Sequence, residues 1–98
     1  MPSVALELEN LFNENQYHDA ISLANLNNIT PDSDPRSSFI QAACLFRIGE
    51  FSTSYEILLQ LESALSADSA YLSLMGAALR RLGRLEDAKP FLETALKL

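Results

Sequence analysis

Apolar residues recur along this chain at the three- and four-residue intervals that place side chains on one face of a helix. Two of the clearest runs are Leu72, Met75, Gly76, Leu79 and Leu82, and then Leu85, Ala88, Leu92, Ala95 and Leu96. No segment alternates between apolar and polar residues with the two-residue period of a strand. The pattern therefore predicts an all-α protein with six helices, at about 3–14, 17–28, 35–48, 51–65, 69–82 and 85–97.

The same order of residue types returns every 34 positions along the chain. Each repeat has a turn former at one position: Asn15, Gly49 and Gly83. A bulky apolar residue follows two positions later, and a small residue three positions after that: Tyr17, Phe51 and Leu85, then Ala20, Ser54 and Ala88. A turn residue that tolerates a left-handed backbone, a large residue across the corner and a small residue between two helices together favour a helical hairpin. We therefore expect one domain, 1–98, of three antiparallel hairpins at about 1–34, 35–68 and 69–98.

Two aspartates, Asp34 and Asp68, occupy equivalent positions directly before predicted helices. An aspartate there accepts hydrogen bonds from the free backbone N–H groups of the first turn. Pro35 follows Asp34 at the first helical position, where proline is favoured. Pro90, by contrast, falls inside the last predicted helix, where it removes one backbone hydrogen bond. Because Pro90 lies near the start of that helix, we expect a mild bend rather than a break.

The third repeat resembles a tetratricopeptide repeat over residues 71–98. The family pattern is matched by Leu72, Met75, Gly76, Leu79, Gly83, Leu85, Ala88, Leu92 and Ala95, with Leu in place of the usual aromatic residues. The earlier repeats match less closely, since Ala42 and Leu8 stand where the family has a helix-packing Gly. The resemblance covers essentially the full chain, and it implies a short right-handed solenoid of three hairpins that binds other proteins without catalysis.

In this family the first helix of each hairpin lines a concave groove, so the resemblance also implies a set of partner-binding residues. Carried onto this sequence, they are Ala5, Phe12, Arg36, Phe39, Ile40, Ala43, Phe46, Arg47, Leu74, Ala77, Arg80 and Arg81. Many relatives hold a peptide carboxylate with Lys, Asn and Arg, but the matching positions here are Ala5, Glu9, Ile40, Ala70 and Leu74. What remains is an apolar channel edged by arginines, which suits an amphipathic helix with apolar anchors and acidic residues along its rim. Phe39 and Phe46, seven residues apart, fit either the groove or the core.

The composition is that of an ordered single domain: 98 residues, 48% of them hydrophobic and 20% charged. The formal net charge of −6 arises within residues 1–35, which contain six acidic residues and no Lys or Arg. Binding to nucleic acid requires a basic patch, and none is apparent, so DNA and RNA are not expected partners. The first twenty residues also carry no Lys or Arg and no unbroken apolar run, so we expect neither a signal peptide nor a membrane span. A single cysteine cannot form an internal disulfide, so we expect a reducing, cytoplasmic location.

No group of residues in the sequence forms a recognisable catalytic or metal-binding set. Cys44 is the single cysteine and is interpreted as a buried core thiol, and His18 as a solvated side chain. Glu7, Glu9 and Glu14 lie at unlike angles around a helix, so a solvated acidic face is the simpler interpretation. We therefore expect no enzyme activity, no cofactor and no metal.

Two functional hypotheses remain. The first is a protein-binding module or chaperone that holds an amphipathic helical segment of a client. Small type III secretion chaperones that guard a needle subunit are similar to this chain in size, repeat number and architecture. The second hypothesis is a structural adaptor that forms a homodimer or a larger assembly through its C-terminal helix, which carries no polar capping helix after it.

Overall fold

The computed structural model describes residues 3–97, and within that range it contains helices and connecting turns but no strand. The helices are α1 (Val4–Asn13), α2 (Tyr17–Leu26), α3 (Pro35–Arg47), α4 (Phe51–Gln60), α5 (Glu62–Leu65), α6 (Ser69–Arg81) and α7 (Leu85–Lys97). The prediction of an all-α protein is confirmed for these residues. The starts of the helices agree with the sequence pattern within one residue, and five of the six predicted helices are present as single elements.

The turns and caps explain why the helices begin and end where they do. Asn15, Gly49 and Gly83 all have positive φ angles, of 63°, 90° and 80°, as expected of turn residues between paired helices. Asp34 accepts a hydrogen bond from the backbone N–H of Ser37 at 3.1 Å, and Asp68 accepts one from Tyr71 at 3.0 Å. The predicted N-caps of α3 and α6 are therefore confirmed.

The prediction of one helix over 51–65 is wrong, because the chain turns at Leu61 between α4 and α5. The backbone carbonyl of Leu58 accepts the hydroxyl of Tyr71 at 2.8 Å and the N–H of Leu61 at 3.1 Å. The N–H of Leu61 bonds to the carbonyl three residues back instead of four, which is the tighter 3₁₀ pattern and ends the α-helix. The Leu61 side chain is fully buried. A residue from α6 thus supports the interruption of α4, which local sequence does not reveal.

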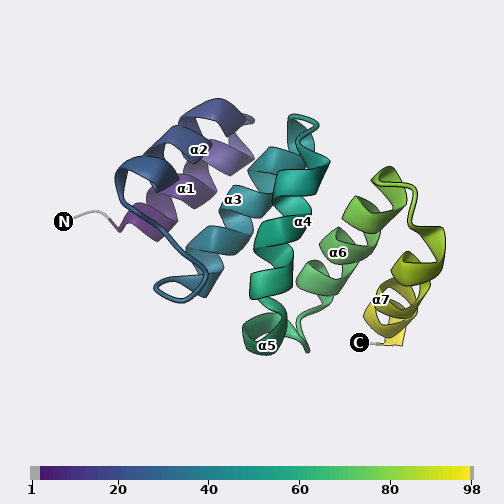
Figure 1. Ribbon diagram of the computed structural model, residues 1–98. Coiled ribbons are helices and arrows are strands. Elements are labelled where there is room, and N and C mark those ends of the chain that lie inside the picture. The colour runs from purple at the N-terminus through teal and green to yellow at the C-terminus, as the bar shows by residue number, and fades with distance from the viewer. Residues whose placement is uncertain (1–2, 98) are drawn as a thin grey trace.

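The helices pack as successive antiparallel pairs set side by side (Figure 1). α1 contacts α2, α3 contacts α4 and α6 contacts α7, while α3 also packs on α1, α2 and α6. The assembly measures 42 × 24 × 21 Å, with α1 and α2 at one end and α7 at the other. α7 continues through Pro90 without a break, as predicted.

The buried apolar residues form two clusters on either side of α3. The larger core joins the second and third hairpins and contains Ala42, Leu58, Leu61, Tyr71, Leu72, Met75, Ala78, Leu79 and Ala88. The smaller core joins the first hairpin to α3 and contains Leu8, Ala20, Ala24 and Cys44. Cys44 is fully buried, which confirms the interpretation of a core thiol. α3 contributes to both cores through different faces, with Ala42 in the larger core and Cys44 in the smaller one.

Between residues 3 and 97, no helix is both long enough and apolar enough to cross a bilayer.

Candidate functional site

Three adjoining hollows follow α1, α3 and α6, the first helices of the three pairs. The central hollow has a volume of about 520 Å³. It is lined by Phe12, Phe39, Ile40, Ala43, Phe46, Arg47, Ala70, Ser73, Leu74 and Ala77. Its floor is apolar, and Ala43 and Ala77, which occupy equivalent positions in successive repeats, keep it deep because their side chains are short.

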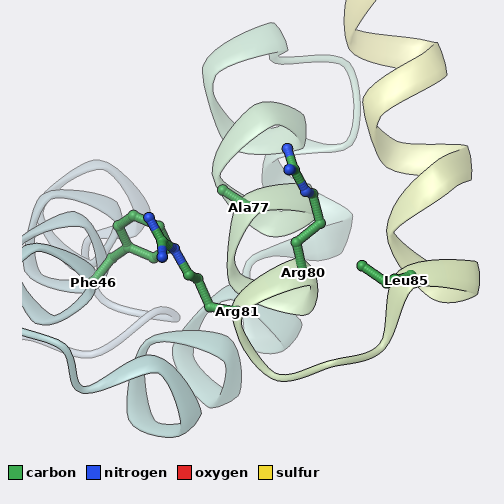
Figure 2. Close-up of a pocket in the computed structure, with 5 residues that line it drawn as sticks. All are labelled: Phe46, Ala77, Arg80, Arg81 and Leu85. Atoms are coloured by element: carbon green, nitrogen blue, oxygen red, sulfur yellow. The ribbon is translucent and has the colours of Figure 1, made fainter.

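The other two hollows extend the central one toward opposite ends of α3 and α6. One, of about 460 Å³, is lined by Glu9, Phe12, Asn13, Arg36, Phe39, Ile40, Leu65, Asp68 and Ala70. The other, of about 370 Å³, lies at the C-terminal ends of α3 and α6 and is lined by Phe46, Ala77, Arg80, Arg81 and Leu85 (Figure 2). Since each shares lining residues with the central hollow, the three form one continuous surface, which we call the groove.

All of the partner-binding residues that the family resemblance implies, except Ala5, line the groove. Ala5 is partly buried on α1 and lines none of the three hollows. Phe39 and Phe46 are both partly exposed; each packs against the larger core and also lines the groove. The two interpretations of these phenylalanines therefore apply together, since one side of each ring is buried and the other faces the groove.

Three groove residues lie outside the first helices, where the family resemblance placed the groove. Leu65 lies on α5, whose separation from α4 was not predicted, and Asp68 is the N-cap of α6. Leu85, at the start of α7, was assigned only to hairpin packing, but its side chain lines the same hollow as Arg80 and Arg81 and lies on the Arg80 side of it (Figure 2). Its equivalence to Tyr17 and Phe51 does not indicate this exposure, because those two aromatic residues pair with a phenylalanine of their own hairpin.

Aromatic pairs and arginines repeat with the 34-residue period at the rim of the groove. Phe12 packs on Tyr17 with ring centroids 5.7 Å apart, and the equivalent Phe46 packs on Phe51 at 5.1 Å. An arginine from the next hairpin lies over one ring of each pair. The Cζ atom of Arg47 is 5.9 Å from the ring centroid of Phe12, and that of Arg81 is 5.8 Å from the ring centroid of Phe51. Cation–π attraction of this kind holds the arginines at the rim.

The arginines of the groove differ in their acidic partners. Arg36 lies 3.8 Å from Glu9 of α1, an exposed ion pair that ties α1 to α3. Arg47, Arg80 and Arg81 have no carboxylate within 4.0 Å among residues 3–97. The C-terminal end of the groove therefore presents positive charge without a carboxylate partner from the described chain. Glu9 was expected to belong to a solvated acidic face; its side chain is 45% exposed, with Arg36 of α3 beside it.

The groups that were weighed for catalysis or metal binding lie apart from one another. Burial raises the pKa of the Cys44 thiol from 9.0 to about 11, so the reactive thiolate is scarce at neutral pH. His18 is exposed on the first turn of α2. Across residues 3–97, His, Cys, Asp and Glu side chains form no group of three or more that is suited to hold a metal ion. The groove is accordingly the feature on which a functional proposal rests.

No protein-family model matches the chain, and no curated protein is significantly similar to it. What the groove does must therefore be inferred from its own shape and charge.

Proposed function

We propose that this protein is a non-catalytic binding module of the tetratricopeptide type, acting in the cytoplasm, whose three hairpins form a short right-handed solenoid. In this proposal the groove holds an amphipathic helical segment of a partner protein. The observation that carries it is the continuous groove itself, which has an apolar floor, arginines at its rim, and lining residues at equivalent positions of successive first helices.

The chemistry of the floor favours an apolar stripe as its occupant. Ile40, Ala43, Leu74 and Ala77 offer no hydrogen-bonding side chain, so a polar segment would lose its hydration there without compensation. A helix presents apolar residues at three- and four-residue intervals along one face and satisfies its own backbone hydrogen bonds, which suits such a surface. A segment of that kind would bury its stripe in the groove and leave its polar face in water.

Phe39 and Phe46 of the groove are already fixed in position before a partner binds. Phe39 and Phe46 pack against the larger core on one side and are partly exposed on the other. Since packing already restricts their rotamers, they lose little side-chain freedom when a partner covers them. Binding to the folded state alone would also raise the stability of the protein by mass action.

The test is a selection from a displayed library of short amphipathic peptides with leucines at helical spacing and randomised flanks. The expected result is a set of peptides that bind the protein, and whose binding is lost in Phe39→Glu and in Phe46→Glu while the helical circular dichroism spectrum is kept. Leu26→Glu is the matched control, because Leu26 is 80% exposed on α2 and lies outside the groove. If no selected peptide depends on Phe39 or Phe46, the proposal is wrong.

A narrower version is a chaperone that shields a needle subunit of type III secretion. It predicts that co-expression with such a subunit yields a soluble complex of the two chains, and that Phe39→Glu abolishes the complex. An insoluble or unbound subunit would restrict the proposal to other partners.

A second candidate function is self-association through α7. Leu85 and Leu96 on this helix are 58% and 89% exposed, and α7 packs chiefly against α6. A homodimer or scaffold built on this face predicts a concentration-dependent mass in light scattering that Leu96→Glu abolishes. A constant monomer mass at high concentration would refute it.

A further inference from the structure

Two arginines at the rim of the groove occupy the same site in successive repeats. Arg47 and Arg81 are 34 positions apart, each in the last turn of a first helix, and each guanidinium lies over an aromatic ring of the preceding hairpin. Attraction between a guanidinium and an aromatic ring acts through the charge and does not require the hydrogen-bond donors of the guanidinium. These two side chains therefore lie near their aromatic rings with donors left for a partner.

Among the described residues, acidic partners accompany other arginines but not these two. Arg84 is bound to Asp87 at 2.9 Å and Arg36 lies 3.8 Å from Glu9, whereas Arg47 and Arg81 have no carboxylate within 4.0 Å between residues 3 and 97. Arg80 shares the last turn of α6, and Figure 2 shows Arg81 extending toward Phe46 while Arg80 leaves the helix in another direction. Three guanidinium groups thus stand next to an apolar floor, at one end of the groove.

We infer that Arg47, Arg80 and Arg81 select a partner helix that carries acidic side chains on one flank of its apolar stripe. The inference rests on the proposed function and adds the charge of the partner. A guanidinium fork donates two N–H bonds to one carboxylate, which makes such a pair stronger and more directional than a lysine contact. The acidic flank would lie along the C-terminal ends of α3 and α6, so it fixes which way the partner's polar face is turned.

A separate protein segment fits this surface better than the acidic first hairpin of a second copy. The occupant needs a free apolar stripe beside its acidic residues. In the first hairpin the large apolar residues that are mostly exposed are Leu6 on α1 and Leu26 on α2, one on each helix, while Leu8 is buried in the smaller core. Neither helix offers a free stripe to enter the groove of another molecule.

The experiment uses the peptides selected for the proposed function and asks what their flanks contain. Wild-type protein should enrich Asp and Glu on one flank of the leucine stripe. The double variant Arg47→Glu/Arg81→Glu should enrich Lys and Arg at the same positions. If groove-dependent peptides appear but their flanks show no preference for charge, the inference is overturned and the proposed function stands. If no groove-dependent peptide appears, both fail.

A single selected peptide then gives the size of the effect. Replacing its two flanking Glu residues by Gln should weaken binding about tenfold at low salt, with a smaller difference at high salt. In Arg47→Gln/Arg80→Gln/Arg81→Gln the two peptides should bind equally, while Arg84→Gln, which removes an arginine already paired with Asp87, should keep the full difference. A tenfold difference that persists in the triple variant would contradict the inference.

Light scattering tests the competing occupant. Self-association of the wild-type protein that is abolished by Arg47→Gln/Arg81→Gln would assign the arginines to a second copy, and would overturn the inference of a separate partner.

Discussion

The first and third hairpins follow the same 34-residue plan, yet they are held to the molecule by different means. The first contributes Leu8, Ala20 and Ala24 to the smaller core, where two of the three residues are alanines. The third hairpin contributes six residues to the larger core: Tyr71, Leu72, Met75, Ala78, Leu79 and Ala88. Because the free energy of burial scales with apolar area, the third hairpin gains more stabilisation from buried apolar residues than the first.

The N-caps of the helices also indicate that the first hairpin is the less stable of the two. α6 has the Asp68 cap, whereas neither α1 nor α2 has a side-chain hydrogen bond at its N-cap. A missing cap costs a helix about 1 kcal/mol. The first hairpin should therefore open at a lower free energy than the rest, so segments that share one sequence pattern need not have the same local stability.

The largest expected effect comes from truncating one residue of each core. Leu58→Ala should lower the free energy of unfolding of the larger core by about 2–5 kcal/mol, because it leaves a cavity among fully buried neighbours. Leu8→Ala should instead release the first hairpin and leave α4, α6 and α7 folded. Hydrogen exchange measured residue by residue distinguishes the two outcomes. Equal loss of protection in α1 and α6 after Leu8→Ala would show that the hairpins unfold together.

A smaller effect is expected where the repeats differ at one equivalent position, occupied by Leu8, Ala42 and Gly76. In the third hairpin α7 approaches so closely that a Cβ on Gly76 would lie 2.5 Å from Cδ2 and 2.6 Å from Cγ of Leu92. Gly76→Ala should therefore destabilise the protein by about 1–3 kcal/mol in urea unfolding, despite the higher helix propensity of alanine.

The control for Gly76→Ala is a double-mutant cycle. In the background of Leu92→Ala the space is vacant, and Gly76→Ala should then be neutral or stabilising. A purely additive pair would mean that the close approach of α6 and α7 is not what requires glycine at this position.

The smallest effect is a dependence on alkaline pH, which differs between the two cores. In the smaller core, burial raises the pKa of Cys44 from 9.0 to about 11. In the larger core, burial raises the pKa of Tyr71 from 10.0 to about 12, with smaller contributions from Glu62 and Tyr55. A raised pKa means that the folded state holds the proton more tightly. The stabilisation from each group is therefore complete below its unfolded pKa and is lost as pH rises through the folded value.

Urea midpoints measured from pH 8 upward should thus decline first through Cys44, above about pH 9, and then through Tyr71, above about pH 10. Cys44→Ala should remove the first part of the decline. Tyr71→Phe should remove the second, at a cost of about 1 kcal/mol for its hydrogen bond to Leu58. An unchanged decline in both variants would assign the pH dependence to other groups.

Much of the fold follows from local chemistry that the sequence displays. Asp34 and Asp68 mark helix starts because their carboxylates reach backbone N–H groups within one turn, and Asn15, Gly49 and Gly83 mark turns because they accept positive φ. The break at Leu61 was missed because it involves Tyr71, a residue from another helix. Local patterns do not encode such a contact.

The candidate site shows the same division. The repeat register places Phe12, Phe39 and Phe46 on the first helices, where the structure finds the groove. It does not distinguish Arg36, which pairs with Glu9, from Arg47, which has no such partner within residues 3–97. Charge pairing depends on the reach of side chains from neighbouring helices, so it has no signature in the spacing of the sequence.

The position of α3 between the two cores has a kinetic consequence. Ala42 belongs to one core and Cys44 to the other, while Ile40 and Ala43 of the same helix line the groove. A partner bound to α3 would stabilise the helix that contributes to both cores. Its residence time should then be coupled to the rate at which the first hairpin detaches. Because detachment exposes the buried Cys44, the alkylation rate of this thiol should report how long the groove is occupied, although Cys44 does not line the groove.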